Sequence, residues 1–313
     1  MITVIATDPS FGASYNIKKA LSALDETILL CSHTDKWRKR PEGTITAVIT
    51  PKNARQYLDK VSNSDLVFIV GGSSINILKM FPGHNTWVPN LHLVAWMTDS
   101  YYRKNSKYVN KQLQRWGCSQ MFVQPDDTLY PLVPRNTLPL LHPISLKFPG
   151  EEKTKRVSVM HSPGRPGKRK QKGSDTIERV VRQLSKRFRF DYYCLMGMPH
   201  AACLKRKAQA HIFVDKLATS VSKGLGKSGL EAMASRCAVI SSLHNHAPWR
   251  QYFTDPPVFR GDTAEQLESA LRTLLMTPAF RKSRQEAARA WIEKYWGLEN
   301  NAWLDYFTRY ARL

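Results

Sequence analysis

The chain has 313 residues, 42% of them apolar, and its lysines and arginines exceed its aspartates and glutamates by 22. This composition excludes a disordered chain and provides enough apolar surface for two cores of ordinary size. The charge excess favours a polyanionic partner such as nucleic acid or an acidic membrane surface. No apolar run reaches the roughly 18 residues that a membrane-spanning helix needs.

Apolar strands alternate with helical segments in the first half of the chain. Four strands are predicted, over residues 2–6, 26–31, 64–70 and 91–96. Between the first two, three apolar residues at helical spacing predict a helix: Ile17, Leu21 and Leu24. Continuous apolar strands suit a parallel sheet, in which ligands bind at the carboxyl ends of the strands. Gly12, Gly72 and Asp99 should therefore converge on one rim.

Residues 124–150 differ in character from the segments on either side. They contain several prolines and little apolar periodicity, which predicts a linker between two domains. The expected division is an N-terminal domain over 1–148, a C-terminal domain over 149–298, and a terminal helix over 299–313 that packs back on the first domain. The aromatic stripe of that helix is interpreted as packing, not as a ligand site.

The second half restarts the alternation of strands and helices. Strands are predicted over residues 156–160, 191–195, 211–214 and 238–242, and helices over 175–188 and 230–236. A further helix begins at Thr263, with Gln266 as the partner of a capping box.

The N-terminus and the cysteines both bear on the cellular compartment. Residues 1–6 are apolar with no basic residue before them, which predicts a buried strand and not a signal peptide. The five cysteines are scattered and none forms a CxxC pair. We expect reduced core cysteines, no metal site, and a cytoplasmic protein.

Two loops carry the chemistry, and each lies between an expected strand and an expected helix. The first covers residues 161–174 and contains three glycines and five lysines and arginines. Glycines let backbone N–H groups approach an anion, and a helix start adds partial positive charge, so the loop suits a diphosphate; a solvated basic loop is the alternative. In the second loop, small residues open a helix and Glu231 sits in its first turn. That carboxylate suits the two neighbouring hydroxyls of a ribose, or simply a favourable helix start.

The second segment, GLGKSGLEAMASRCAVISS, resembles the donor-site signature of retaining GT-B glycosyltransferases of the GT4 type. Upstream, HSPGRP and KGSDTIERVVRQL resemble the same family, and MGMPH followed by HIFVD resembles its intervening stretch. Three similar segments in the right order cover about 90 residues. The resemblance implies an α/β protein of GT-B fold, with two Rossmann-like domains whose parallel sheets face a central cleft.

The resemblance also implies a donor site for a UDP-linked sugar. Lys172, Gly173 and Arg165 would hold the diphosphate, and Glu231 the ribose hydroxyls. Backbone amides at a phosphate would come from the start of the next helix, namely Ser228, Gly229 and Leu230. Gly197 and His200 would lie beside the base, and Gly12 would face the donor from the N-terminal acceptor domain.

One position departs from the family pattern. Many such enzymes carry a glutamate eight residues before the one corresponding to Glu231, and here that position is Lys223. The residues that bind the sugar, and whether transfer retains or inverts its anomeric configuration, are therefore left open. No acidic D-x-D pair is present, so no obligatory metal is expected.

Asp99 is the candidate catalytic residue on the acceptor side. It ends an apolar strand, where a carboxylate can take the proton of an acceptor hydroxyl. Capping of the following helix is the alternative. His161, His244 and His246 are further rim candidates with structural alternatives.

The acceptor is inferred from basic clusters that alternate with aromatic residues. These clusters lie at residues 36–40 and 101–111, and a third basic run covers 168–172. Such clusters suit phosphate contacts and base stacking, so the leading hypothesis is a phage-type enzyme that glycosylates a hydroxymethylated base in DNA.

Two alternatives stay open. A peripheral envelope or polysaccharide glycosyltransferase would use its basic surface on anionic lipid, through a basic amphipathic helix such as residues 105–116. A non-catalytic nucleic-acid-binding protein on the same fold is the other. No protein partner is implied.

Overall fold

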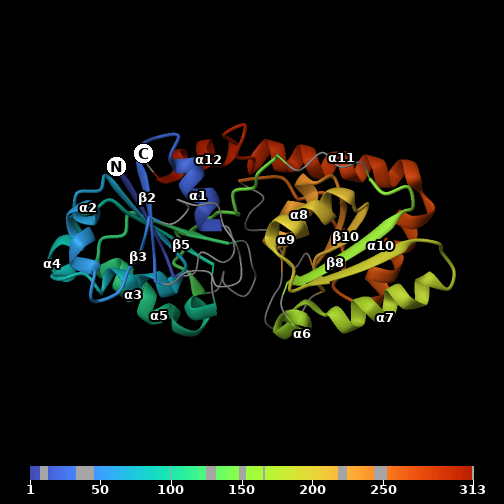
Figure 1. Ribbon diagram of the computed structural model, residues 1–313, viewed down its shortest axis with the longest axis horizontal. Helices are drawn as coiled ribbons and strands as arrows, with labels where there is room; N and C mark the ends of the chain where they lie inside the picture. The colour runs from blue at the N-terminus through green and yellow to red at the C-terminus, as the bar shows by residue number, and fades with distance from the viewer. Residues whose placement is uncertain are drawn as a thin grey trace. The chain divides into compact units, whose positions relative to one another are not determined.

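The computed structural model describes residues 1–7, 13–32, 46–98, 100–124, 132–147, 153–164, 166–217, 224–242 and 252–311. The described residues form two compact units (Figure 1). Unit 1 contains the described parts of Met1–Gln124, Leu129–Pro143 and Trp303–Leu313, and unit 2 those of Ile144–Ala302. In this part of the chain, no helix is both long and apolar enough to cross a membrane.

Unit 1 is built on a parallel sheet of seven described strands. They are β1 (Ile2–Ala6), β2 (Thr27–Cys31), β3 (Ala47–Val48), β4 (Leu66–Val70), β5 (Leu93–Met97), β6 (Gln120–Val123) and β7 (Leu138–Pro139). Their order is β3-β2-β1-β4-β5-β6-β7, so the winding reverses between β1 and β4. Strands β1, β2 and β5 are buried along their whole length, as expected for a sheet covered on both faces.

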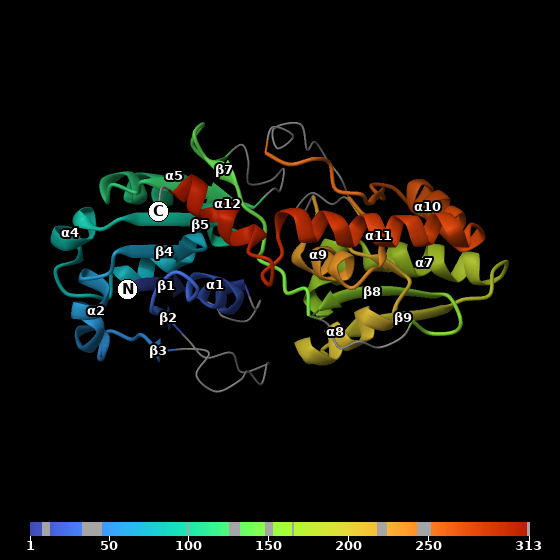
Figure 2. The same cartoon turned by 90° about the horizontal axis from the view of Figure 1, so that it is seen from above.

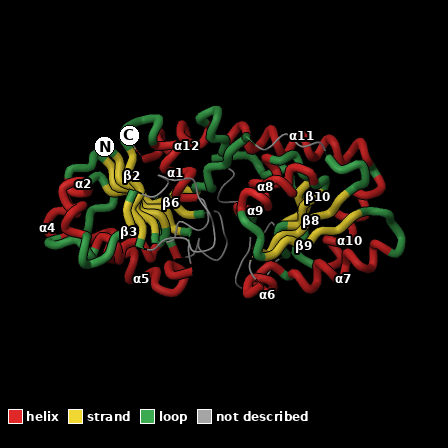
Figure 3. Tube along the Cα trace, viewed as in Figure 1, coloured by secondary structure: helices red, strands yellow, loops and turns green. Residues whose placement is uncertain are grey.

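Helices lie on both faces of this sheet (Figure 3). Those described are α1 (Ala13–Leu21), α2 (Leu58–Ser62), α3 (Ile75–Leu78), α4 (His84–Trp87), α5 (Ser100–Arg115) and α12 (Ala302–Ala311), with short 3₁₀ turns η2 (Ala54–Tyr57), η3 (Gly72–Ser74) and η4 (Val88–Asn90). The predicted face of α1 is correct for Ile17 and Leu21, which are buried, but not for Leu24. Leu24 is exposed because the helix ends at Leu21.

The C-terminal helix α12 packs within unit 1, although it is far from the rest of that unit in sequence. The Phe307 ring lies 4.9 Å from that of Phe68, and the Trp303 ring stacks on Phe307. The Trp303 indole N–H donates to the Leu141 carbonyl at 3.0 Å. Trp303 and Phe307, the buried part of the aromatic stripe, therefore serve for packing, as predicted from the sequence.

Part of the segment expected to be a linker belongs to the sheet of unit 1. Leu138 and Pro139 pair with Phe122 and Val123, and Leu140 and Leu141 are buried. The prolines misled the interpretation because an edge strand tolerates proline, which cannot donate to a ladder.

Unit 2 is built on a smaller parallel sheet of five described strands. They are β8 (Ser158–Gly164), β9 (Asp191–Met196), β10 (Ile212–Val214), β11 (Ala238–Ser241) and β12 (Phe259–Arg260). Their order is β12-β11-β10-β8-β9, so the winding reverses between β8 and β10. In open α/β sheets such a reversal opens a ligand crevice at the carboxyl ends of the two strands.

Helices cover both faces of this sheet as well (Figure 2). Those described are α6 (Arg169–Lys172), α7 (Ser174–Ser185), α8 (His200–Gln209), α9 (Lys227–Ala234), α10 (Ala264–Met276) and α11 (Pro278–Tyr295), with the 3₁₀ turn η6 (Pro166–Lys168). Apolar residues of α7 and α10 form one core with β8, β10 and β11. The start of α10 confirms the predicted cap, since the Thr263 side chain accepts from the Gln266 N–H.

The five cysteines are all free thiols. Three of them are buried, namely Cys31, Cys203 and Cys237, whereas Cys118 and Cys194 are half-buried.

Candidate functional site

The candidate site lies in unit 2, where the winding of the sheet reverses. Strand β8 leads into the basic loop and α6, and β10 ends one residue before Asp215. Two helices begin near these strand ends: α7, directly after Gly173, and α9, directly after Gly226. The two loops singled out in the sequence are therefore both placed at the carboxyl ends of β8 and β10.

Gly173 is required by the turn between α6 and α7. Its φ of 67° is in the left-handed region, which only glycine adopts at no cost. A Cβ added there would also come within 3.1 Å of the Leu217 Cβ. Gly173 is the turn between α6 and α7, so it fixes the position of the preceding Lys172 at the end of α6.

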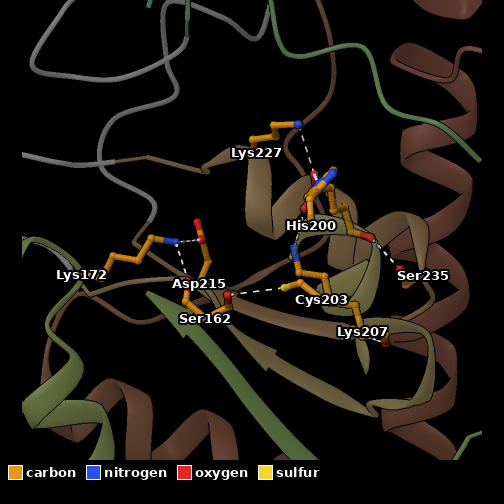
Figure 4. Close-up of polar contacts among 10 residues, drawn as sticks. Ser162, Lys172, His200, Cys203, Lys207, Asp215, Lys227 and Ser235 are labelled. Carbon is orange, nitrogen blue, oxygen red and sulfur yellow. Dashed lines mark hydrogen bonds and ion pairs between the residues drawn. The ribbon is translucent and has the colours of Figure 1, made fainter. Parts of the chain in front are cut away.

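Lys172 points at Asp215, the residue that follows β10 (Figure 4). Its ammonium donates to Asp215 Oδ1 at 3.0 Å and to the Ser162 carbonyl at 3.3 Å. Asp215 is fully buried, whereas the Lys172 side chain keeps 20% of its surface exposed. The exposed part of Lys172 can therefore contact a ligand while the buried Asp215 holds its ammonium in place.

The charge on Asp215 is secured by its surroundings. Burial would raise the pKa of this carboxyl, but Lys172, Lys216 and the Gly226 N–H outweigh burial and lower the pKa to about 2. The Gly226 N–H donates to Asp215 Oδ2 at 2.9 Å. One buried carboxylate thus ties the lysine of the first loop to the start of α9.

The start of α9 needs small residues because Asp215 lies against it. A Cβ added at Gly226 would be 3.1 Å from Asp215 Oδ2, and one at Gly229 would be 2.6 Å from the Leu225 Cδ1. The N–H groups of the first helical turn, including those of Ser228 and Gly229, have no acceptor within the helix and suit an anion.

The Leu230 amide is paired within helix α9. Its N–H donates to the Gly226 carbonyl at 3.0 Å, as expected one turn into a helix. The side chain of Leu230 is fully buried. The expected helix start at Leu230 was three residues late, because α9 already begins at Lys227.

The same shift moves Glu231 out of the first turn. Glu231 lies in the second turn of α9, so a favourable helix start does not explain it. Its carboxylate is met by three cations or N–H donors: His200 and Lys207 from α8, and Lys227 from α9. Burial would raise the pKa of Glu231, but the two lysines and His200 hold it well below its usual range.

His161 has a structural role. It is fully buried, and burial lowers its pKa to about 4, so it is neutral at physiological pH. Its Nδ1–H donates to the Val214 carbonyl at 2.8 Å, which leaves Nε2 to accept from the Ser174 hydroxyl at 2.8 Å. His161 therefore joins β8, β10 and the start of α7, and the structural alternative holds for it.

Gly197 and His200 lie at the end of β9 and the start of α8. Gly197 is exposed with a φ of 63°, and its N–H donates to the Gly164 carbonyl at 2.9 Å. The His200 Nε2–H donates to Glu231 Oε1 at 2.7 Å. The segment between β9 and α8 is thus attached both to the basic loop and to Glu231.

Two residues that hold the site were not singled out from the sequence. Asp215 follows a buried strand at the end that binds ligands, and that position was its signal. Lys207 is four residues after the buried Cys203 on the same face of α8, and a lysine on an apolar helical stripe was its signal.

Several predicted site residues fall outside the described part of the chain: Gly12, Asp99, Arg165, Lys223, His244 and His246. In unit 1, the edge of the sheet at the carboxyl ends of the strands is described only in part. There the Thr7 hydroxyl forms hydrogen bonds with the hydroxyls of Ser73 and Ser74. Gly72 lies there against α5, since an added Cβ would be 2.9 Å from the Tyr102 Cβ. Among described residues, no group of acidic, histidine or cysteine side chains is arranged to hold a metal.

Comparisons with known proteins find similarity in structure. No protein-family model matches the chain, and no curated protein matches it in sequence. Anabaena Alr3699/HepE in complex with UDP and glucose has a TM-score of 0.66 at 10% identity, over 97% of each chain. An alpha-glucosyltransferase in complex with UDP and a 13-mer DNA containing a HMU base has a TM-score of 0.63 at 13% identity, over 93% of each chain.

A third similar structure is WaaG, a glycosyltransferase involved in lipopolysaccharide biosynthesis. Its TM-score is 0.54 at 12% identity, over 93% of this chain and 94% of that chain. At these identities the similarity establishes the fold. The chain has two parallel-sheet α/β units of the GT-B type, which confirms the fold class expected from its sequence.

Proposed function

We propose that the protein is a glycosyltransferase that uses a nucleotide sugar, with its donor site in unit 2. The observation that carries the proposal is the pairing of Lys172 with the start of α9 through Asp215, next to the buried carboxylate of Glu231. A lysine and the N–H groups of a first helical turn, which have no acceptor within the helix, suit a diphosphate, and a carboxylate suits the hydroxyls of a ribose. Structures of similar fold that contain UDP support UDP as the nucleotide.

The proposed reaction is transfer of the sugar to a hydroxyl group. A bond forms between the acceptor oxygen and the anomeric carbon of the sugar, while the bond from that carbon to the diphosphate breaks. The diphosphate leaves with the electron pair, and Lys172 and the N–H groups of α9 stabilise its negative charge. The hydroxyl proton passes to a base, for which Asp99 of the acceptor domain is our proposal.

We propose DNA carrying a hydroxymethylated base as the acceptor. The net charge of +22 supports a polyanion, and one structure of similar fold contains DNA with a HMU base. Helix α5 contributes a row of exposed cations, and its sequence contains no acidic residue. The row consists of Lys107, Lys111 and Arg115, spaced four residues apart after a kink at Asn105.

The packing of α5 favours DNA over a lipid surface. A membrane-bound amphipathic helix needs a free apolar face opposite its charges. Here the apolar residues opposite the row, including Leu113 and Trp116, are fully buried in unit 1. Tyr108 is exposed instead, with the Lys79 ammonium 4.5 Å from its ring centroid, and can stack on a base. Tyr102, part of the same cluster in the sequence, is buried and cannot.

We expect the charges of α5 to set the salt dependence of DNA binding. Replacing Lys107, Lys111 and Arg115 together with glutamine should reduce the slope of log affinity against log salt by about 2 to 3, since each lost phosphate contact removes about 0.9. The measurement is the affinity for a short duplex at several salt concentrations.

The matched control removes the same number of charges elsewhere in unit 1. Glutamine at Lys52, Arg55 and Lys60, which are exposed on η2 and α2 or beside them, should change the slope much less. Equal slopes in wild type and in the α5 variant would remove α5 from the DNA surface. Strong binding of the wild type to anionic vesicles, with no binding to DNA, would favour the lipid-surface alternative.

A further inference from the structure

Lys207 is a buried cation on α8 that pairs with Glu231 of the donor site. Only 1% of the Lys207 side chain is exposed, and its ammonium contacts Glu231 Oε2. The ammonium also lies 5.2 Å from the centroid of the Phe213 ring. Burying an ammonium is costly unless a partner compensates it. Burial acts to lower the pKa of Lys207, but Glu231 outweighs it and raises the pKa, so the lysine stays charged.

The two oxygens of Glu231 have different surroundings. Oε2 faces the fully buried Lys207. Oε1 faces His200 at 2.7 Å and Lys227 at 3.3 Å, whose side chains are 31% and 14% exposed. Figure 4 labels the three cations of this cluster, Lys207, His200 and Lys227. Oε1 is thus the oxygen on the side from which a ligand can approach.

No other described cation is placed to replace Lys207 at Oε2. Helix α11 also packs on α9, but its Arg289 donates to the carbonyls of Ala234 and Leu146. Lys153 donates to the carbonyls of Ala210 and Ser235, at the far end of α9 from its first turn. His200 is no substitute cation near pH 7, because burial is the largest influence on this residue and lowers its pKa.

We propose that Lys207 is a positioning residue, which holds Glu231 Oε2 from inside the domain so that Oε1 is presented, ionised, to the ribose hydroxyls of the nucleotide. The proposal rests on the proposed function, because it assigns the ribose to Glu231. Lys207 itself touches no ligand. A lysine that served only the packing of α8 on α9 would stabilise the fold without affecting which form of Glu231 meets the nucleotide.

The test is the pH dependence of UDP binding, measured by calorimetry between about pH 5.5 and 8.5. In the wild type Glu231 is ionised throughout, so its titration contributes no change. In Lys207→Gln only Lys227 and His200 remain to oppose burial, so the pKa of Glu231 should rise from its wild-type position. The variant should bind UDP about tenfold more weakly near pH 6, and the loss should shrink as pH rises and the carboxylate ionises. The exposed Lys205→Gln on the same helix is the matched control and should follow the wild type.

A second comparison keeps the proposal testable if Lys207→Gln fails to fold. The pair Lys207→Met with Glu231→Gln removes both buried charges, so it should bind UDP as Glu231→Gln does alone. Weaker binding by the pair would mean that Lys207 acts by another route and would overturn the proposal. So would wild-type affinity in Lys207→Gln, or a loss equal at every pH. If the wild type itself binds no UDP, GDP or ADP, the proposed function fails instead.

Discussion

Replacing Glu231 with glutamine should weaken UDP binding by about 100-fold, since hydrogen bonds to a charged acceptor contribute about 1.5–3 kcal/mol each. Glutamine keeps the shape of the side chain and can still accept from Lys207, but the buried ammonium loses its counter-charge, which should cost about 3–5 kcal/mol of stability. Thermal unfolding of the variant is therefore measured beside its UDP affinity. The amide is neutral, however, and a neutral acceptor holds the two hydroxyls of a ribose less strongly. Calorimetric titration with UDP measures the loss, and DNA affinity should stay unchanged.

A matched control separates this role from that of a helix-start acid. Glu265 is exposed in the first turn of α10, in the same unit, where a carboxylate is favoured by the helix dipole alone. Glu265→Gln should leave UDP affinity within about twofold of wild type, because the dipole contributes only about 0.3–1 kcal/mol to stability. If Glu231→Gln bound UDP as tightly as Glu265→Gln, the ribose would have to be placed elsewhere.

The second large effect concerns Lys172 and is specific for the diphosphate. Lys172→Ala removes a cation that reaches toward the ligand, so UDP affinity should fall by about 30- to 100-fold while uridine affinity stays nearly constant. Asp215 then keeps its hydrogen bonds from the Gly226 N–H and the Ser241 hydroxyl. Calorimetry with UDP and with uridine distinguishes loss of phosphate contacts from general damage to the site.

The control for this prediction lies on the same short helix. Lys170 is exposed on α6, and Lys170→Ala changes the net charge by the same amount. It should weaken UDP binding only slightly, because an exposed charge is screened within about 10 Å at ordinary salt. Equal losses of UDP and uridine affinity in Lys172→Ala would contradict a diphosphate contact.

The architecture followed from the sequence because the strands are continuous apolar runs. Residues 64–70 and 91–96 contain β4 and most of β5, and both are buried as a covered parallel sheet requires. Helix ends were less well predicted. The start of α9 was placed at Leu230 because Gly224, Gly226 and Gly229 read as a loop, whereas Gly229 lies inside the helix to make room for Leu225 and Asp215.

The parts of the site that could not be predicted depend on contacts between distant residues. The pair of Lys207 and Glu231 joins two helices, and the pair of Lys172 and Asp215 joins a loop to a strand end. Neither pairing has a local pattern, because each is decided by the order of strands in the sheet. The order places β10 beside β8, although β9 comes between them in sequence.

We propose that this chain transfers a sugar from a nucleotide donor, and one assay tests this transfer most directly. The protein is incubated with several nucleotide sugars and with DNA containing hydroxymethylated pyrimidines, and the DNA is then digested to nucleosides for mass spectrometry. We expect one modified nucleoside to gain the mass of one sugar residue, with release of an equal amount of free nucleotide. Unmodified nucleosides, together with no nucleotide release from any donor, would contradict the account and favour a non-catalytic DNA-binding protein.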